Sequence, residues 1–334
     1  MRAIRLLLLG GGILLFGVLV IRIGPGVVAE SLSQLSWRLL VLVLFPFSIM
    51  TAFDTLGWRF AFRRDGVPFR ALFSARMAGE AFNLTTPTAS VGGEAVKAWL
   101  VRDYVPLAES LPSVIVAKTT ITLAQGIFLA LGVALAWPIL PSGSRLLQGM
   151  TWLLGLEVLA VAGFVAVQMI GLLGKGKRVA SRLGLGRIGE RMHGLLHVDE
   201  ALSHFYRREP RRLLLSVGSH FVGWVLGALE TYLILRLLGV PVPLVTATVI
   251  EAFGTAIRFA TFLVPASLGA LEGGLVAIFG ALGLGAGTGL SFSVVRRLRE
   301  ATWVAFGLIA LAVMRPQVRA VLGEGPGGGP ACAG

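Results

Sequence analysis

The sequence predicts an all-α membrane protein with about eight hydrophobic segments, two of them broken or re-entrant at Pro/Gly-rich points. The first observation behind this is composition: 55% of the 334 residues are hydrophobic and 14% are charged, against about 45–50% and 25% in soluble proteins. The second is that stretches without charge recur at close to the roughly 20 residues that cross a bilayer. The third is a Pro/Gly motif that occurs twice. An ordinary soluble enzyme is therefore excluded.

The charge-free stretches place the helices. They predict helices over residues 3–22, 37–58, 113–138, 149–174, 213–238, 244–264, 270–293 and 300–315. The first could instead be a cleaved signal peptide, but the apolar run 6–21 is long for one, which favours an anchor. We expect a single integral membrane domain over 1–320 and a disordered tail over 321–334, because that tail has no apolar pattern.

Charge predicts the orientation. The chain carries 30 basic and 17 acidic residues, a net charge of +13, which in a soluble protein would suggest nucleic acid as a partner. Here the basic residues fall mostly between apolar runs, so we interpret them as positive-inside signals and contacts with anionic lipids. No nucleic-acid partner is expected. The densest blocks, 59–76 and 175–212, should be cytoplasmic and the turn 138–144 outside, which predicts a bacterial inner-membrane protein with a cytoplasmic N-terminus.

The basic segment 175–212 divides the domain into pseudo-repeat halves of about 1–175 and 213–320. Within it, Leu195, Val198, Leu202 and Phe205 recur at helical spacing. This predicts an amphipathic helix that lies on the membrane surface.

Residues 77–101 lie between two segments that both look cytoplasmic, yet they are apolar with Gly, Pro and Thr interruptions. A hairpin that enters and leaves the membrane on one side would satisfy this. Its motif, Pro-Thr-Ala-Ser-Val-Gly-Gly-Glu over 87–94, is similar to Pro-Ala-Ser-Leu-Gly-Ala-Leu-Glu over 265–272. Two such motifs in opposite halves predict a duplicated broken helix. The backbone positions predicted to form the breaks are Pro87, Gly92, Gly93, Pro265, Ser267 and Gly269.

These residue types suit a broken helix for physical reasons. Proline ends the incoming helix, and Ser90 or Ser267 can cap a new one. Glycine permits close backbone approach, so the helix N-terminus could face an anion such as a phosphate. Kinked helices with close glycine packing are the alternative, but kinks alone do not require Glu94 and Glu272 at equivalent offsets.

Ionisable residues within the spans are functional candidates, because each costs at least about 2.5–3.5 kcal/mol to insert. Glu94 and Lys97 are three residues apart and could offer one acceptor and one donor to a zwitterionic headgroup. Glu251 and Arg258 share a helix face, which predicts a hydrated interior surface. Proton movement could supply the energy for transport, with Glu80, Glu94, Glu251 or Glu272 as the proton carrier.

Other charges have a second interpretation. Lys118 and Arg236 lie near predicted helix ends, and we interpret them as snorkelling to the interface. The cluster 296–300, Arg-Arg-Leu-Arg-Glu, is either a cytoplasmic anchor or a phosphate-binding site at the mouth of a cavity.

Motifs for catalysis or cofactor binding are missing from the sequence. It contains no Walker loop, Rossmann fingerprint or nucleophile elbow. His193 and His197 lack the glutamate of a zincin, and the only cysteine, Cys332, excludes a cysteine-based metal site. We therefore expect no cofactor, no metal, no ATPase and no enzyme activity.

The motif residues resemble a known family. Asn83 to Pro87, Gly92-Gly93-Glu94 and Lys97, with 265–272 and the Arg296/Arg297 pair, look like the multi-spanning domain of lysylphosphatidylglycerol synthases. That domain also occurs as stand-alone flippase-like proteins, some associated with hopanoid biosynthesis. The resemblance covers about 1–320 and implies a lipid-translocating role, carried by Glu94, Lys97, Glu272 and Arg297. Lys97 departs from the family's usual arginine, which keeps the charge but loses a bidentate phosphate grip. The larger synthases carry a soluble aminoacyl-transferase domain for which this sequence has no room, so aminoacyl transfer is not expected.

The leading prediction is a flippase-like translocase for an amphiphilic lipid, whether a phospholipid, an aminoacyl-lipid or a hopanoid. The residues predicted to contact the headgroup are Glu80, Asn83, Glu94, Lys97, Glu251, Arg258, Glu272 and Arg297. One alternative is a non-catalytic scaffold or lipid-binding subunit, with 175–212 as a docking surface for lipid-biosynthesis enzymes. Another is a membrane-embedded enzyme that uses Glu94 and Glu272 as acid and base.

Overall fold

The computed structural model describes residues 38–86, 92–141, 143–170 and 193–321, with isolated positions 14, 18, 21 and 26. These residues form ten α-helices and one short 3-10 helix, and this described part contains no strand. The predicted all-α class is therefore confirmed. The predicted helix 3–22, the motif residues Pro87 and Ser90, the first part of the basic segment and the tail from residue 322 lie outside the described residues.

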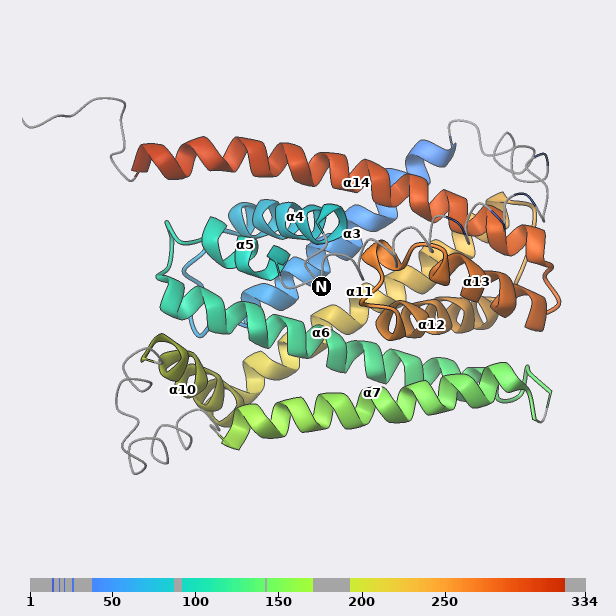
Figure 1. Cartoon of the computed structure of the whole chain (residues 1–334), viewed down its shortest axis with the longest axis horizontal. Helices are drawn as coiled ribbons and strands as arrows, with labels where there is room; N and C mark the ends of the chain where they lie inside the picture. Colours follow the sequence, from blue (N-terminus) through green and yellow to red (C-terminus); the bar gives the residue numbers. More distant parts are fainter. Residues whose placement is uncertain are drawn as a thin grey trace, which may run out of the picture.

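Five long helices run along the molecule (Figure 1). They are α3 (Arg38–Phe60), α6 (Leu107–Ala136), α7 (Arg145–Ile170), α11 (Pro210–Leu237) and α14 (Ala286–Val321). At 1.5 Å per residue they are about 35–54 Å long, more than the roughly 30 Å of a hydrocarbon core. Within the described residues, α6, α7 and α11 combine this length with enough hydropathy to cross a membrane. The predicted count of about eight segments is not confirmed.

Prolines mark where several helices begin. Pro68 precedes α4 (Phe69–Thr85), Pro106 precedes α6 and Pro243 precedes α12 (Leu244–Ala260), each with an extended ψ near 140–152°. Pro210 is the first residue of α11. Proline suits these places because the first helical N–H groups have no partner in the helix and its fixed φ is already helical.

Two helical hairpins fill the middle of the bundle. One consists of α4 and α5 (Gly92–Leu100), the other of α12 and α13 (Ala270–Ala281). Figure 1 shows that they enter from opposite ends and that each returns to its own end. The tip of the second hairpin, the 3-10 helix Pro265–Ser267, contacts α4. The break of the second hairpin therefore lies against α4, inside the bundle.

The second hairpin corrects two predicted helices. The predicted helix 270–293 ends at Ala281, and the predicted helix 300–315 begins earlier, at Ala286. Gly283 and Gly285 adopt φ of 72° and 85° in the connecting turn, a conformation that costs glycine little. The arginines at 296, 297 and 299 lie within α14 and not at its end. They pair with glutamates of other helices, as described below. Residues 244–281 thus make a helical hairpin broken at 265–269, as the Pro/Gly motif predicted, but its second helix is shorter than expected.

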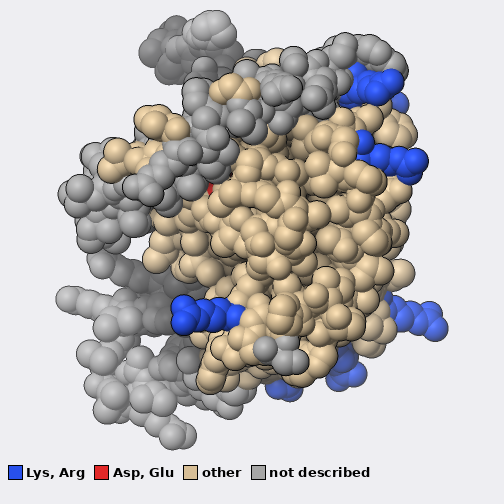
Figure 2. Space-filling view, turned by 90° about the vertical axis from the view of Figure 1, so that its right-hand side faces the viewer, with Lys and Arg blue, Asp and Glu red and all other residues tan. Residues whose placement is uncertain are grey.

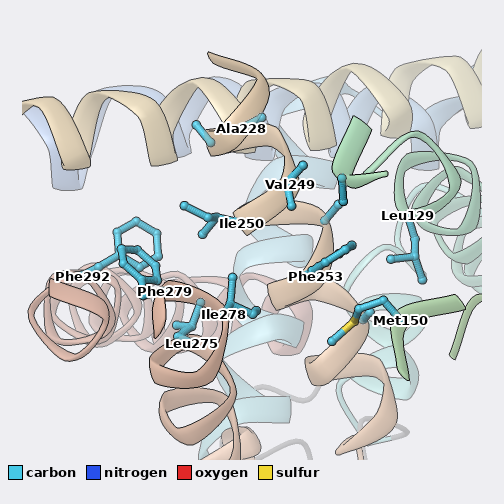
Figure 3. Close-up of a cluster of buried hydrophobic side chains, with 14 of the residues drawn as sticks. Leu129, Met150, Ala228, Val249, Ile250, Phe253, Leu275, Ile278, Phe279 and Phe292 are labelled. Carbon is cyan, nitrogen blue, oxygen red and sulfur yellow. The ribbon is translucent and has the colours of Figure 1, made fainter. Parts of the chain in front are cut away.

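The apolar core has two parts. The larger joins α6, α7 and α11 to the second hairpin and α14, with Phe253, Phe279 and Phe292 fully buried (Figure 3). The smaller lies around Trp58, Leu72 and other residues of the first hairpin's end. On α7 the outward side chains are apolar and exposed, as lipid contact requires; Trp152 is 81% exposed.

The predicted amphipathic helix exists as α10 (His193–Arg208), but its environment differs from the prediction. Leu202 and Phe205 are buried in the smaller core, with α10 packed against α6 and α7. The part of its apolar face formed by Val198, Leu202 and Phe205 therefore contacts protein, where the prediction had a lipid surface.

The two ends of the molecule differ in charge. The end where α6 meets α7 is mostly uncharged, with lysines and arginines toward its edges (Figure 2). The opposite end carries Arg63 and Arg64 in the turn after α3 and the basic last turn of α10. The basic end carries the loops predicted to be cytoplasmic, and the mostly uncharged end carries the turn 138–144 predicted to be outside.

Candidate functional site

Arg296 and Glu251 form a buried ion pair that joins α14 to α12. Arg296 donates to both carboxylate oxygens, with N···O distances of 2.5 and 3.0 Å. Thr231 of α11 donates to the same carboxylate at 2.7 Å. Glu251 is 1% exposed, so these contacts replace its hydration. The predicted face of Glu251 and Arg258 is therefore occupied by ion pairs with α14.

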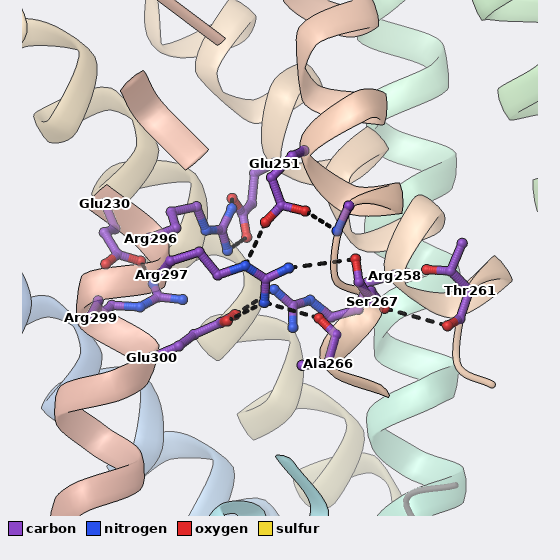
Figure 4. Close-up of polar contacts among 12 residues, drawn as sticks. Glu230, Glu251, Arg258, Thr261, Ala266, Ser267, Arg296, Arg297, Arg299 and Glu300 are labelled. Carbon is purple, nitrogen blue, oxygen red and sulfur yellow. Dashed lines mark hydrogen bonds and ion pairs between the residues drawn. The ribbon is translucent and has the colours of Figure 1, made fainter. Parts of the chain in front are cut away.

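Arg297 ties α14 to the break of the second hairpin (Figure 4). It donates to Glu272 at 2.5 Å and to Glu300 at 2.7 Å. It also donates to the carbonyl of Ala266 at 2.9 Å. Ala266 and Ser267 have φ of 52° and 49°, a left-handed conformation that L-residues with a side chain adopt at a cost. The guanidinium thus holds a backbone turn that the local sequence does not favour.

Two further pairs complete this network. Arg258 donates to Glu300 at 2.5 Å, and Arg299 pairs with Glu230 of α11. The network consists of Arg258, Arg296, Arg297 and Arg299 with Glu230, Glu251, Glu272 and Glu300. Its formal charge is zero, four positive against four negative. Neutrality and pairing explain how these groups lie inside an apolar bundle.

Glu272 also caps the helix that it begins. Its Oε2 accepts from the backbone N–H of Gly269 at 2.6 Å, and Gly269, with φ of 76°, is the N-cap residue of α13. Ser267 does not cap α13, contrary to one expectation, because it lies in the preceding 3-10 turn. The N-terminus of α13 was expected to face a ligand anion. Instead, the carboxylate of Glu272 accepts a hydrogen bond there.

Another charged cluster lies at the first hairpin and is called the first cluster below; the network around Arg296 is the second. Lys97 of α5 donates to Glu80 of α4 at 2.7 Å and to Glu94 at 3.2 Å. Lys118 of α6 approaches Glu94 at 3.7 Å. The side chain of Lys97 is 5% exposed, whereas those of Glu80 and Lys118 are 45% and 53% exposed. The cluster therefore has a buried ammonium at its centre and two accessible charges of opposite sign.

Asp54 of α3 extends this cluster toward α11. It accepts from Arg76 of α4 at 2.8 Å and lies 2.9 Å from Nδ1 of His220, which is fully buried. With His220 neutral, Asp54, Glu80 and Glu94 balance Arg76, Lys97 and Lys118. Both clusters thus contain as many cations as anions.

Close approach of two glycines positions the first hairpin. Gly93 lies directly against the backbone of Gly79, and a Cβ on either would collide with the other helix. The N–H of Gly93 donates to Oδ1 of Asn83 at 2.7 Å, which satisfies one of the free donors at the start of α5. Small residues are what helices in membranes need for such contact.

The first cluster borders a small cavity of about 30 Å³. Its walls include Arg76, Glu80, Glu94, Lys97 and Lys118, with Trp58 among the apolar residues. This volume has room for about one or two water molecules and not for a lipid headgroup.

The structure divides the eight predicted headgroup residues into two groups. Glu80, Asn83, Glu94 and Lys97 gather at the first hairpin, whereas Glu251, Arg258, Glu272 and Arg297 belong to the second network. The second group is engaged internally, with Glu251 and Glu272 almost inaccessible.

Sequence reasoning left several members of these clusters out of the predicted site. The omitted residues are Asp54, Arg76, Lys118, His220, Glu230, Arg296, Arg299 and Glu300. Lys118 was interpreted as an interfacial side chain, yet it borders the cavity. Asp54 and His220 were available as charged or titratable residues inside apolar runs, which is the signal that identifies such sites. Arg236, by contrast, is exposed and bonds only to Tyr232 among the contacts described, in line with its interfacial interpretation.

Comparison with known proteins now identifies the family. The family model described as the lysylphosphatidylglycerol synthase TM region matches residues 3–309. The chain belongs to this family. A relative described as a UPF0104 membrane protein, from Methanothermobacter thermautotrophicus strain Delta H, is 25% identical over 310 residues, covering 86% of this chain and 88% of the relative. No solved structure matches the chain. The chain is therefore a membrane protein of the lysylphosphatidylglycerol synthase TM region type, as the motif residues suggested.

Proposed function

We propose that this protein moves an amphiphilic lipid between the leaflets of a membrane and that the first cluster receives the headgroup. The observation that carries the proposal is a pair of accessible charges of opposite sign, Glu80 and Lys118, beside one polar cavity. Each lies eleven residues from the start of its helix, which is about 17 Å from the basic end of the molecule. Charges at that depth are unfavourable against hydrocarbon, so they support a hydrated opening in the side of the bundle.

A zwitterionic or aminoacylated headgroup suits this opening. The carboxylate of Glu80 is an acceptor for an ammonium, and the ammonium of Lys118 is a donor for a phosphate. Solvation of the headgroup by these groups lowers the barrier that hydrocarbon sets against polar groups, while the acyl or polycyclic tail remains in the bilayer. No nucleotide or cofactor is needed for downhill movement, so we propose a transporter and not an enzyme.

The size of the cavity adds a conformational requirement. At about 30 Å³ it must widen before a headgroup enters. The Lys118–Glu94 contact, 3.7 Å long, is the loosest ion pair of the cluster and joins α6 to α5. We therefore propose that separation of α5 from α6 opens the site.

The orientation follows from the same charges. We propose that the end with Arg63, Arg64 and α10 faces the cytoplasm and that the protein resides in a cytoplasmic membrane, in accordance with the positive-inside rule. The first hairpin then opens from the cytoplasmic side and the second from the other side.

The test is lipid movement in liposomes that contain the full-length protein. Phospholipids labelled on the headgroup are added to one leaflet, and the fraction that becomes inaccessible to a membrane-impermeant quencher is followed over time. We expect acceleration over protein-free vesicles and at least about a tenfold loss in Lys118→Gln, because a charge-assisted hydrogen bond contributes roughly 1.5–3 kcal/mol. Lys118→Arg should retain most activity.

Arg236→Gln is the matched control, since Arg236 is also an exposed basic residue of a long helix but bonds only to Tyr232 in the part of the chain described. Its transfer rate should equal that of the wild type. If vesicles with zwitterionic, anionic and aminoacylated phospholipids all show no acceleration by the wild-type protein, the proposed function is wrong.

A further inference from the structure

Glu157 differs from every carboxylate of the two clusters. It is the thirteenth of the 26 residues of α7, so it lies at mid-depth in a membrane-spanning helix. Its neighbours Leu156 and Leu159 face outward and are 58% and 71% exposed, whereas Glu157 is 1% exposed. The side chain therefore points into the bundle.

Neither carboxyl oxygen of Glu157 has a hydrogen-bond partner among the residues that the structure describes. In contrast, the seven carboxylates of the two clusters each have a cationic partner within 4 Å. Glu157 lies against α6, where a Cβ on Gly126 would be 3.8 Å from its carboxyl carbon and from Oε1. Because Gly126 has no side chain, it offers no polar side-chain group to this carboxyl.

The charged groups of the helices packed against α7 lie far along the helix axes. On α6, Lys118 and Glu109 are 8 and 17 residues before Gly126, about 12 and 26 Å away along the axis. On α12, Glu251 and Arg258 pair with Arg296 and Glu300 of α14.

The third neighbour, α10, packs near the far end of α7. There Arg207 donates to the carbonyl of Met169, twelve residues or about 18 Å from Glu157. The other titratable residues of α10 are His193, His197, Asp199, Glu200, His204, Tyr206 and Arg208. On α7 itself, Arg145 is twelve residues away in the other direction. No described cation is therefore placed to neutralise a carboxylate at Glu157.

A carboxylate removed from water without a counter-ion or hydrogen bonds is far less stable than the neutral acid. We propose that Glu157 is a proton-binding site in the membrane interior, occupied by a proton at neutral pH. Glu80, Glu94, Glu251 and Glu272 are poor proton carriers by the same reasoning, because each is stabilised as a carboxylate by a lysine or arginine. The proton site of this fold thus lies on α7, outside both charged clusters.

The test is infrared spectroscopy of the full-length protein in lipid bilayers at neutral pH. In the difference between wild type and Glu157→Gln we expect the loss of a protonated-carboxyl C=O band, shifted in ²H₂O, with the carboxylate bands unchanged. Glu200→Gln is the matched control, because Glu200 is exposed on α10 and its replacement should remove carboxylate absorption only. Loss of carboxylate absorption in Glu157→Gln would overturn the proposal.

A chemical measurement on the wild-type protein avoids dependence on the variant's folding. Dicyclohexylcarbodiimide enters membranes and adds to a protonated carboxyl group: the acid proton moves to nitrogen, the oxygen bonds to the central carbon, and acyl migration gives a stable N-acylurea with no leaving group. Peptide mapping should find this adduct on Glu157 and not on Glu251 or Glu272. A wild-type protein without the adduct on Glu157, after exposure that labels an added carboxylic acid, would also overturn the proposal.

Discussion

The Arg296–Glu251 pair shows how a single side chain stabilises this fold. Arg296 contributes two hydrogen bonds to one carboxylate, and removing either member leaves the other without its charge partner inside the bundle. Loss of one partner of a buried pair is far more costly than replacement of both by neutral groups. The pair therefore contributes to stability mainly because the loss of one member leaves the other as an unpaired buried charge.

This argument predicts the behaviour of two variants. Arg296→Met should destabilise the protein by about 3–5 kcal/mol, because Glu251 is left with Thr231 alone. The double variant Arg296→Met, Glu251→Gln should recover a large part of that loss. Unfolding in detergent, followed by circular dichroism, measures both. A double variant less stable than Arg296→Met would contradict this account of the pair.

Asp65, in the turn between α3 and α4, gives a pH-dependent prediction. A hydrogen bond from Arg212, 2.5 Å long, lowers the pKa of Asp65 below its ordinary value, with Arg59 adding a weaker attraction. The pKa of Asp65 is thus lower in the folded protein than in the unfolded chain. Its contribution to stability is present above the unfolded value near 3.9 and is lost as the pH falls below it.

We therefore expect Asp65→Asn to lower stability by at most about 1 kcal/mol at pH 7, since Asp65 is 44% exposed and surface pairs contribute little. The difference in melting temperature between wild type and variant should shrink as the pH falls below about 3.9 and should vanish only below the lowered pKa of folded Asp65. Arg70→Gln, at an exposed arginine of the same basic end, is the control. A difference that grows on acidification would refute the linkage.

At this scale, sequence reasoning found many charged residues but few of their partners. Glu251 and Arg258 share a helix face, as their spacing required, yet each pairs with α14, 45 and 42 residues away. Spacing along one helix fixes a shared face and says nothing about which distant helix covers it. Lys118 was misplaced for a related reason: α6 begins six residues earlier than predicted, so the residue lies deeper than a helix end.

At the scale of the element, the two hairpins differ in how far the sequence revealed them. The first was predictable because residues 77–101 lie between two basic segments, which requires an even number of crossings. The break of the second was predictable from its Pro/Gly motif, but the turn that ends its second helix was not, because 270–293 contains one acidic residue and no basic one. The sequence signals for this turn were the glycines at 280, 283 and 285. The positive φ of Gly283 and Gly285 shows that these two form the turn.

The contact of α4 with α5 predicts the effect of one methyl group. Gly93→Ala should destabilise the protein by about 1–3 kcal/mol, because the new Cβ meets the backbone of Gly79 and the side chain of Asn83. Gly163→Ala on α7 is the matched control, since open space surrounds that position; it should leave stability equal or raise it by up to about 1 kcal/mol. Thermal unfolding of both variants checks the difference. Equal losses would show that the close approach is unimportant.

At the scale of the whole molecule, the charge asymmetry of the two ends predicts which residues face which compartment. In a Cys332→Ser background, Ser144→Cys at the α6–α7 turn should react with a membrane-impermeant maleimide added outside intact cells. Asp103→Cys, at the opposite end beyond α5, should react only after the membrane is permeabilised. The reverse pattern would invert the proposed orientation and place the opening of the first hairpin outside.

The order in which helices are synthesised adds a consequence of the α4–α14 contact. Gly307 of α14 packs against Met77 and Ala81 of α4, so the first hairpin acquires part of its cover more than 200 residues after it leaves the ribosome. The arginines at 296, 297 and 299 likewise need acceptors on α11, α12 and α13 before their helix is stable in lipid. We therefore expect biogenesis to end with a late assembly step, in which α14 enters the membrane alongside partners already inserted. Chains truncated before residue 286 should remain targets of membrane quality control.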